Sequence, residues 1–217
     1  SDFIRKDVEK MIKILLGAPG SGKGTMAQKL TTTLNIPQIS TGDIFRKNLK
    51  EETPLGLQVK SIMARGALVP DEITIEIVKN RLAEEDCANG YILDGFPRSL
   101  AQAAALETFQ DIDFAVNLDV DKETVVKRLS GRRFCPDCNG TYHISTLEQE
   151  TVCPHCGGKL IIRADDAEET VRERQRVYET TTLPLLEFYK DRGKLITVDG
   201  DGTVDEVYDR ILSVLKK

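Results

Sequence analysis

The sequence has no apolar run that approaches the roughly 18 residues needed to span a membrane. Its first ten residues carry three acids and no apolar core, which argues against a signal peptide or a transit peptide. Internal repeats and low-complexity linkers are also absent. These absences predict a cytoplasmic protein that has no membrane partner.

Positive charge is in short supply, because 30 Lys and Arg stand against 35 Asp and Glu, a formal net charge of −5. A negative balance argues against a general affinity for nucleic acid or anionic lipid, so we expect neither as a partner. Any binding of anions must then come from Arg and Lys residues that gather locally in the fold.

The 217 residues suit one domain, or one domain with an insertion, and a hydrophobic share of 40% is enough for a core. Strand-like and helix-like segments alternate, which predicts an α/β fold with a parallel sheet flanked by helices. We expect strands at residues 12–16, 37–40, 91–96, 114–120 and 195–198. We expect helices at residues 26–30, 44–50 with Thr41 as N-cap, 54–65, 73–85, 99–109, 121–129, 167–192 with a kink at Pro184, and 204–215.

A glycine-rich loop between the first strand and the first helix has the composition of a phosphate-binding loop. It contains Gly20, Ser21, Gly22, Lys23, Gly24 and Thr25. Glycines let backbone N–H groups converge on an anion, the helix N-terminus adds positive charge, and Lys23 reaches the terminal phosphates. The alternative is a flexible loop with a chance Gly-Lys pair, which the flanking strand and helix disfavour.

Gly24 stands where a Walker A loop has the Ser or Thr that ligates Mg²⁺. The metal ion should therefore be held by phosphate oxygens and by water that carboxylates order from outside. Asp94 is the first candidate, since it ends a predicted parallel strand, where open α/β sheets bind ligands. Its alternative role is that of a helix or turn cap.

Four cysteines form two C-x-x-C pairs whose inner members are separated by 14 residues: Cys135, Cys138, Cys153 and Cys156. Four thiolates predict a structural Zn²⁺ with no open position for chemistry, which keeps residues 132–163 rigid. The alternative is a pair of disulfides. His155 should point outward, and Cys87 should be a small core residue or a helix-end residue. A zinc ribbon that binds nucleic acid is also conceivable, although no basic-aromatic pattern surrounds Arg132, Arg133 and Lys159.

Taken together, these motifs closely resemble those of adenylate kinases. The resemblance rests on five motifs in that family's order, within residues 12 to about 207: Gly17–Thr25, Ser40–Asp43 with Arg46, Asp94–Arg98 with Gln102, Gly131–Arg133, and Arg163–Asp166 with Arg172 and Arg174. The four-cysteine insert resembles the zinc-bearing lid of many long-lid bacterial members.

This resemblance implies a P-loop nucleoside monophosphate kinase fold in three parts. Residues 1–40, 67–131 and 164–217 would form the core, 41–66 an AMP-binding helical subdomain, and 132–163 a zinc-binding lid. The implied activity is reversible, Mg²⁺-dependent phosphoryl transfer from ATP to AMP, giving two ADP, by a monomer. The nearest alternative is a kinase for GMP or a pyrimidine monophosphate.

The same resemblance assigns the site residues. Those implied in catalysis are Lys23, Asp43, Asp94, Arg98, Arg132, Arg163 and Arg174. ATP binding falls to Gly20, Ser21, Gly22, Lys23, Gly24, Thr25, Arg128, Thr141, Tyr142 and Gly202. AMP binding falls to Thr41, Arg46, Ala67, Leu68, Val69, Gly95, Phe96, Pro97, Arg98, Gln102, Arg163 and Arg174. The alternative for Gln102 is a polar residue on an exposed helix face. Asp165 and Asp166 serve lid closure or form a charge pair at a helix N-terminus, while Arg133 and Arg172 are flanking charges.

Overall fold

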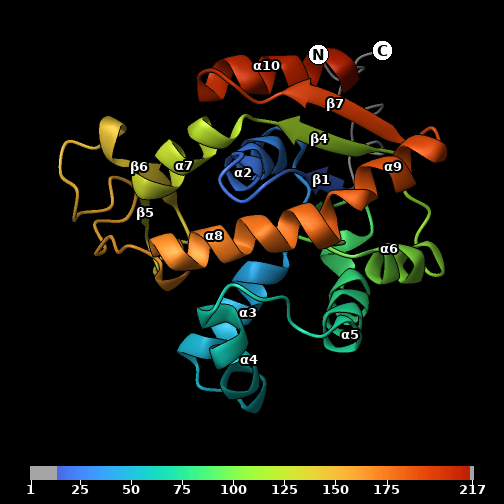
Figure 1. Ribbon diagram of the computed structural model, residues 1–217, viewed down its shortest axis with the longest axis horizontal. Coiled ribbons are helices and arrows are strands. Elements are labelled where there is room, and N and C mark those ends of the chain that lie inside the picture. The colour runs from blue at the N-terminus through green and yellow to red at the C-terminus, as the bar shows by residue number, and fades with distance from the viewer. Residues whose placement is uncertain (1–13, 216–217) are drawn as a thin grey trace.

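A computed structural model describes residues 14–215, and within that range the chain forms a five-stranded parallel sheet flanked by helices (Figure 1). The strand order is β2-β3-β1-β4-β7. The strands are β1 (Ile14–Leu16), β2 (Gln38–Ser40), β3 (Ile92–Asp94), β4 (Ala115–Asp119) and β7 (Leu195–Asp199). The predicted α/β fold is thereby confirmed. The start of the first predicted strand, at residues 12–13, and the predictions about residues 1–10 lie outside the described residues.

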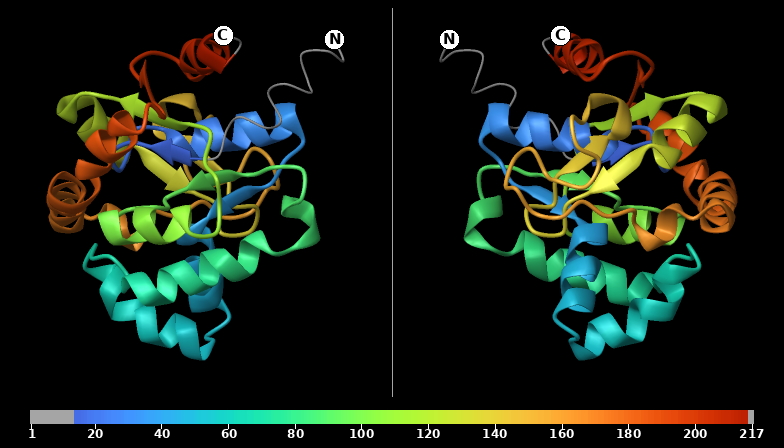
Figure 2. Two further views of the ribbon diagram at one scale, coloured as in Figure 1. Left: turned by 90° about the vertical axis from the view of Figure 1, so that its right-hand side faces the viewer. Right: turned by 90° about the vertical axis from the view of Figure 1, so that its left-hand side faces the viewer.

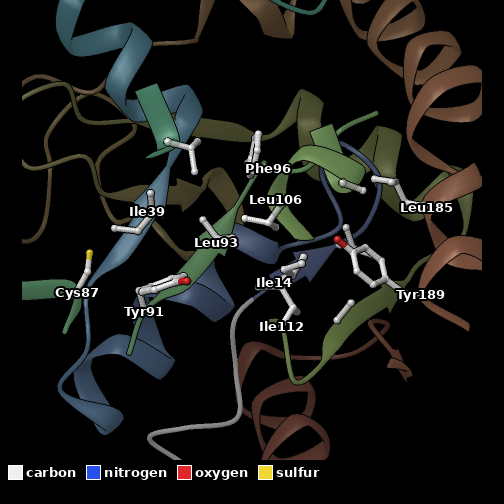
Figure 3. Packing of buried hydrophobic residues seen from close by; sticks show 14 residues of the cluster. Ile14, Ile39, Cys87, Tyr91, Leu93, Phe96, Leu106, Ile112, Leu185 and Tyr189 are labelled. Carbon is white, nitrogen blue, oxygen red and sulfur yellow. The ribbon is translucent and has the colours of Figure 1, made fainter. Parts of the chain in front are cut away.

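The central strands are buried because helices cover both faces of the sheet, as parallel sheets require. On one face, side chains such as Leu15 and Val116 pack beneath α2 (Lys23–Leu34) and α10 (Val204–Leu215). On the other face, Leu93, Leu106 and Tyr189 belong to a second buried cluster, shown in Figure 3. The sheet therefore rests between two apolar layers and presents its carboxyl edge as a rigid platform.

Three helices, more than a simple crossover needs, lie between β2 and β3: α3 (Thr41–Lys50), α4 (Pro54–Ala64) and α5 (Asp71–Leu82). They extend below the sheet in both views of Figure 2. Phe45, Val59 and Val69 form the buried centre of their own hydrophobic cluster. The predicted N-cap at Thr41 is wrong by one residue. Ser40 caps α3, because its Oγ accepts from the Asp43 N–H at 3.2 Å and Thr41 is already helical.

The remaining helices of the sheet layer are α6 (Leu100–Glu107), α7 (Lys122–Ser130), α8 (Glu168–Val177) and α9 (Pro184–Asp191). A π-helical turn, Tyr178–Thr182, joins α8 to α9, so the predicted helix over residues 167–192 is interrupted just before Pro184, where a kink is expected. The Leu183 N–H donates to Tyr178 O at 2.7 Å, and Pro184 has no N–H with which to continue the ladder. Among residues 14–215, no helix is both long and apolar enough to cross a bilayer.

The insert between α7 and α8 has little regular structure. Its two antiparallel strands are β5 (Arg132–Phe134) and β6 (Thr141–His143), with an isolated bridge from Phe134 to Ile161. Its buried centre consists of Cys135, Cys153 and Leu160. The chain then re-enters the sheet layer through a short 3-10 turn, Ala164–Asp166.

Candidate active site

The loop after β1 leads directly into the N-terminus of α2. Gly22 is left-handed, at φ 95°, and no side chain caps the first turn of the helix. Gly20 is also left-handed, and a Cβ there would lie 2.7 Å from Leu129 Cγ, so a larger residue would not fit. The backbone N–H groups of this turn are thus oriented for an anion rather than for a capping side chain.

Lys23 is the first residue of α2 and lies half-buried at the centre of the site. Its Nζ donates to Ala18 O at 3.3 Å. Burial lowers the pKa of Lys23 to about 7; the charge of Asp94 opposes this shift, and Arg98, Arg174 and Arg132 add to it. The structure therefore gathers at least four cations, from four separate segments, around one point.

Two aspartates hold three of the predicted arginines. Asp166 accepts from Arg132 Nε at 2.7 Å and from Arg174 at 3.1 Å. Asp165 accepts from Arg163 at 2.7 and 2.9 Å. Burial by itself would raise the pKa of Asp165, but the charges of Arg174 and Arg163 prevail and lower it. Neither aspartate caps α8, so these contacts favour a role at the base of the insert over a charge pair at a helix N-terminus.

Asp94 lies at the carboxyl end of β3, only 9% exposed, beside the phosphate loop. Its Oδ2 accepts from Gln38 Nε2 at 2.9 Å, and a Cβ on Gly24 would lie 3.5 Å from the same oxygen. Asp43 faces the same cavity and forms an ion pair with Arg46. Gln38 is a polar residue that the sequence analysis missed. The one sequence feature that could have indicated a role for Gln38 is its amide in a short apolar strand. The pairing of β2 with β3, which brings it to Asp94, cannot be read from the sequence.

A cavity of about 760 Å³ is lined by the loop and by all of the other predicted ATP residues. It is lined by Gly20 through Thr25, Arg128, Thr141, Tyr142 and Gly202, and also by Asp43, Arg46, Asp94, Arg98, Arg132, Arg163 and Arg174. Arg128 donates to Ser21 O at 3.0 Å and to Gly200 O at 2.8 Å, which joins the loop to the segment after β7.

A smaller cavity of about 70 Å³ lies on the other side of the arginines, toward α3 and α5. Most of the predicted AMP residues line it: Thr41, Arg46, Ala67, Leu68, Val69, Gly95, Arg98, Gln102, Arg163 and Arg174. Gln102 is 1% exposed, so the alternative of an exposed helix face is wrong. Its Oε1 accepts from the Arg98 N–H, and its Nε2 donates to Asp71, each at 2.8 Å.

Phe96 and Pro97 do not line that cavity. Phe96 is 0% exposed, and its ring packs in the apolar cluster drawn in Figure 3. Pro97 borders a separate void of about 50 Å³. Any contact of Phe96 with a ligand would therefore come from its backbone.

The four predicted metal ligands come together in the insert. Their Sγ atoms all lie within 4.8 Å of one another, with 3.5 Å between Cys135 and Cys156 and 3.7 Å between Cys138 and Cys153. A disulfide would need about 2.05 Å, so the disulfide alternative is excluded. Tetrahedral zinc with bonds of about 2.3 Å requires sulfurs about 3.8 Å apart, so this donor set fits zinc.

The sequence also predicts the positions of one histidine, His155, and of the fifth cysteine, Cys87. His155 is exposed and is not a member of the cysteine cluster. Cys87 is buried in the larger apolar core, as predicted. The Tyr142 hydroxyl lies 3.3 Å from Cys153 Sγ, although the same residue also borders the large cavity.

Comparison with known proteins gives a consistent result. A family model described as adenylate kinase matches residues 15–194. The chain is 52% identical over 209 residues to the adenylate kinase of Clostridium tetani, covering 93% of this chain and 97% of that protein. It is 50% identical over 211 residues to the adenylate kinase of Finegoldia magna, covering 94% and 98% of the two chains. It is also 50% identical over 210 residues to that of Caldicellulosiruptor saccharolyticus, covering 94% and 96%.

Proposed function

Since the chain belongs to the adenylate kinase family, and is thus a nucleoside monophosphate kinase, we propose that it transfers the terminal phosphoryl group of MgATP to AMP. The observation that carries this proposal is the convergence of Lys23, Arg98, Arg132 and Arg174 on the large cavity, because two of them, Arg98 and Arg174, also line the small one. Positive charges gathered this closely repel one another, and the phosphate groups of two nucleotides would supply the negative charge that offsets the repulsion.

The reaction needs little covalent chemistry from the protein. An oxygen of the AMP phosphate attacks the γ-phosphorus of ATP, and the bond from that phosphorus to the β–γ bridging oxygen breaks, which leaves two ADP. The attacking phosphate is already ionised, so no general base is required. The protein contributes in-line positioning and neutralisation of the charge that spreads over the transferred group.

Each cation has a part in this scheme that its position supports. Lys23 and the N-terminus of α2 bind the phosphates of ATP, and Arg128 lies against its base. Arg46 and Arg98 bind the phosphate of AMP. Arg132, Arg163 and Arg174 hold the transferred group, and phosphate oxygens would replace the carboxylates of Asp165 and Asp166 as their partners.

Magnesium would enter with ATP as part of the substrate and neutralise phosphate charge. Its waters would donate to Asp94 and Asp43, whose carboxylates border the cavity that contains the phosphate loop. Gln38 leaves Asp94 Oδ1 available, because the amide takes up Oδ2. This arrangement would compensate for Gly24, which offers no hydroxyl to the metal ion.

Gln102 is suited to recognise adenine. A Gln amide has two N–H donors and two acceptor lone pairs, and the contacts with Arg98 and Asp71 use one of each. One donor and one acceptor are left on a rigid, buried amide that borders the small cavity. Adenine offers a matching acceptor and donor side by side. This pairing favours AMP over GMP, UMP and CMP.

We further propose that residues 41–66 and 132–163 close over AMP and ATP. Both have hydrophobic centres of their own, although the cluster around Phe45 and Val59 also includes Val69 and part of α5. The two segments touch at Lys50 and Asp137, 3.7 Å apart. Zinc on the four cysteines would supply the bonds that keep the lid rigid and would take no part in the transfer. Closure would exclude water, the competing acceptor.

A coupled assay for ADP formation, with AMP, GMP, UMP or CMP as acceptor, tests the proposal. We expect ADP from ATP and AMP, with AMP the preferred acceptor by kcat/KM. The absence of such a preference would contradict the assignment to AMP. Light scattering of the purified chain would test the predicted monomer, and cell fractionation the predicted cytoplasmic location.

A further inference from the structure

Tyr142 belongs to two environments at once. Its backbone is part of β6, where it pairs with Arg133, and it borders the cavity of about 760 Å³ between Thr141 and His143. Its side chain packs against the buried centre of the insert. The hydroxyl ends 3.3 Å from Cys153 Sγ. Its sequence position alone indicates a contact with ATP and nothing about the cysteines.

The backbone next to the Tyr142 ring leaves just enough space for the hydroxyl to reach Cys153. A Cβ on Gly140 would lie 2.6 Å from the Tyr142 hydroxyl and 2.9 Å from its ring. Any side chain at position 140 would therefore displace the hydroxyl from Cys153. The space for the tyrosine is thus provided by a glycine of the first C-x-x-C loop.

Hydrogen bonds to metal-bound thiolates matter because four thiolates and Zn²⁺ carry a net charge of −2. A metal-bound thiolate has no proton to donate, so the Tyr142 O–H, 3.3 Å from Cys153 Sγ, would be the donor once zinc is bound. An O–H donor on a ligand disperses its charge and fixes its orientation.

We propose that Tyr142 is an outer partner of the zinc site, whose hydroxyl donates to the Cys153 thiolate and slows loss of the metal ion. The proposal rests on zinc as the bound metal and is independent of which nucleotide is phosphorylated. It also links strand β6, whose residues Thr141, Tyr142 and His143 border the large cavity, to the metal centre.

The test is the rate at which zinc leaves the intact, zinc-loaded protein when a chromogenic chelator is in excess. We expect Tyr142→Phe to release zinc about tenfold faster than the wild type or more, since outer partners typically contribute 10- to 100-fold to metal affinity. Phe keeps the ring and its packing. Tyr208→Phe is the matched control. It removes the hydroxyl of a tyrosine on α10 that donates to Thr33 of α2, outside the insert, so its rate of zinc release should equal that of the wild type.

Two results would overturn the inference. One is an equal release rate for Tyr142→Phe and the wild type. The other is a loss of thermal stability in Tyr142→Phe that is the same with zinc bound and after chelation, because the hydroxyl would then serve packing alone. A chain that cannot be loaded with one zinc ion would remove the metal assignment, and this inference with it, whether or not ADP is formed.

Discussion

The sheet and the insert at residues 132–163 are stabilised in opposite ways. The sheet buries apolar side chains on both faces, including Ile14, Leu15 and Leu93 at 1% exposure or less. The insert has four buried residues, Phe134, Cys135, Cys153 and Leu160, each 5% exposed or less, and two of them belong to the four-cysteine cluster. About 30 residues cannot bury enough surface to fold alone. The insert thus has a four-cysteine cluster where the sheet has an extensive apolar core.

The two regions also contribute charge differently. Lys23 and Arg98 project from elements fixed to the sheet, whereas Arg132 and Arg163 stand at the two ends of the insert. Asp166 joins the regions, because it binds Arg132 of the insert and Arg174 of α8. Changes in the insert, at the joint around Asp166 and in the sheet should therefore affect activity and stability to different degrees.

Removal of zinc should unfold the insert and leave the sheet intact. Structural zinc sites contribute an apparent free energy of about 10–16 kcal/mol, so chelation removes most of what holds residues 132–163. We expect protease cleavage within 132–163 and a large loss of ADP formation, while far-ultraviolet circular dichroism keeps its helical signal. Cys138→Ser should reproduce this behaviour. Loss of the helical signal together with the metal would contradict the separation of the two regions.

Asp166→Asn should weaken the joint between the regions. The Asp166 side chain is 1% exposed, and the substitution keeps its shape but leaves two buried guanidinium groups underpaired. Breaking a buried ion pair costs about 3–5 kcal/mol, which for a chain of this size lowers Tm by roughly 6–20 °C. Calorimetry on the ligand-free protein measures this decrease in Tm.

The control for Asp166→Asn is Glu173→Gln, which breaks an exposed pair with Arg176 on the same helix. Exposed pairs contribute about 1 kcal/mol or less. Equal changes in Tm for the two variants would show that burial at the joint is unimportant.

Much of the fold was predictable, because the relevant signals are local. Apolar runs gave the strands, Pro184 the irregular helix, and the C-x-x-C spacing the cysteine cluster. Contacts between distant segments were not predictable. Gln38 reaches Asp94 only because β2 lies beside β3, and Asp166 meets Arg132 only because the insert returns to its starting point. The motif around Phe96 predicts that this residue lies near the AMP site, but it does not predict that the side chain is buried in the core.

Lys23→Met should separate function from stability within the sheet region. Removing one preorganised charge at a phosphoryl-transfer site should reduce kcat by about 10²- to 10³-fold. Tm should not fall, because the lysine lies among three arginines and its burial opposes the charged form. Lys60→Met, an exposed substitution on α4, should leave kcat unchanged. A Tm loss as large as the activity loss would make Lys23 a structural residue.

The lowered pKa of Lys23 gives this variant a second readout. The unfolded chain binds the proton up to about pH 10.5, but the ligand-free folded protein releases it near pH 7. Between these values the unfolded state holds more protons, so stability should rise with pH. Lys23→Met should remove that increment from stability curves measured between about pH 7 and 10. The same increment in both proteins would assign it to another group.

The smallest effect concerns the Gln38 contact with Asp94. Gln38→Met keeps the length of the side chain but loses the donor to Asp94. The kcat should fall by about tenfold, because a hydrogen bond to a charged group contributes about 1.5 kcal/mol at the low end of its range. Gln38→Glu should cost more at neutral pH, because it places a second carboxylate against Asp94.

The pH dependence distinguishes positioning from packing at this site. Two adjacent carboxylates share a proton more readily as the pH falls, and the protonated side chain of the Gln38→Glu variant donates to Asp94 as the amide does. The kcat of Gln38→Glu relative to the wild type should therefore recover between about pH 8 and 6, while that of Gln38→Met stays constant, with KM for AMP unchanged in both. If neither ratio changes with pH, the amide fills space without orienting Asp94, and the rigid edge of the sheet positions that carboxylate unaided.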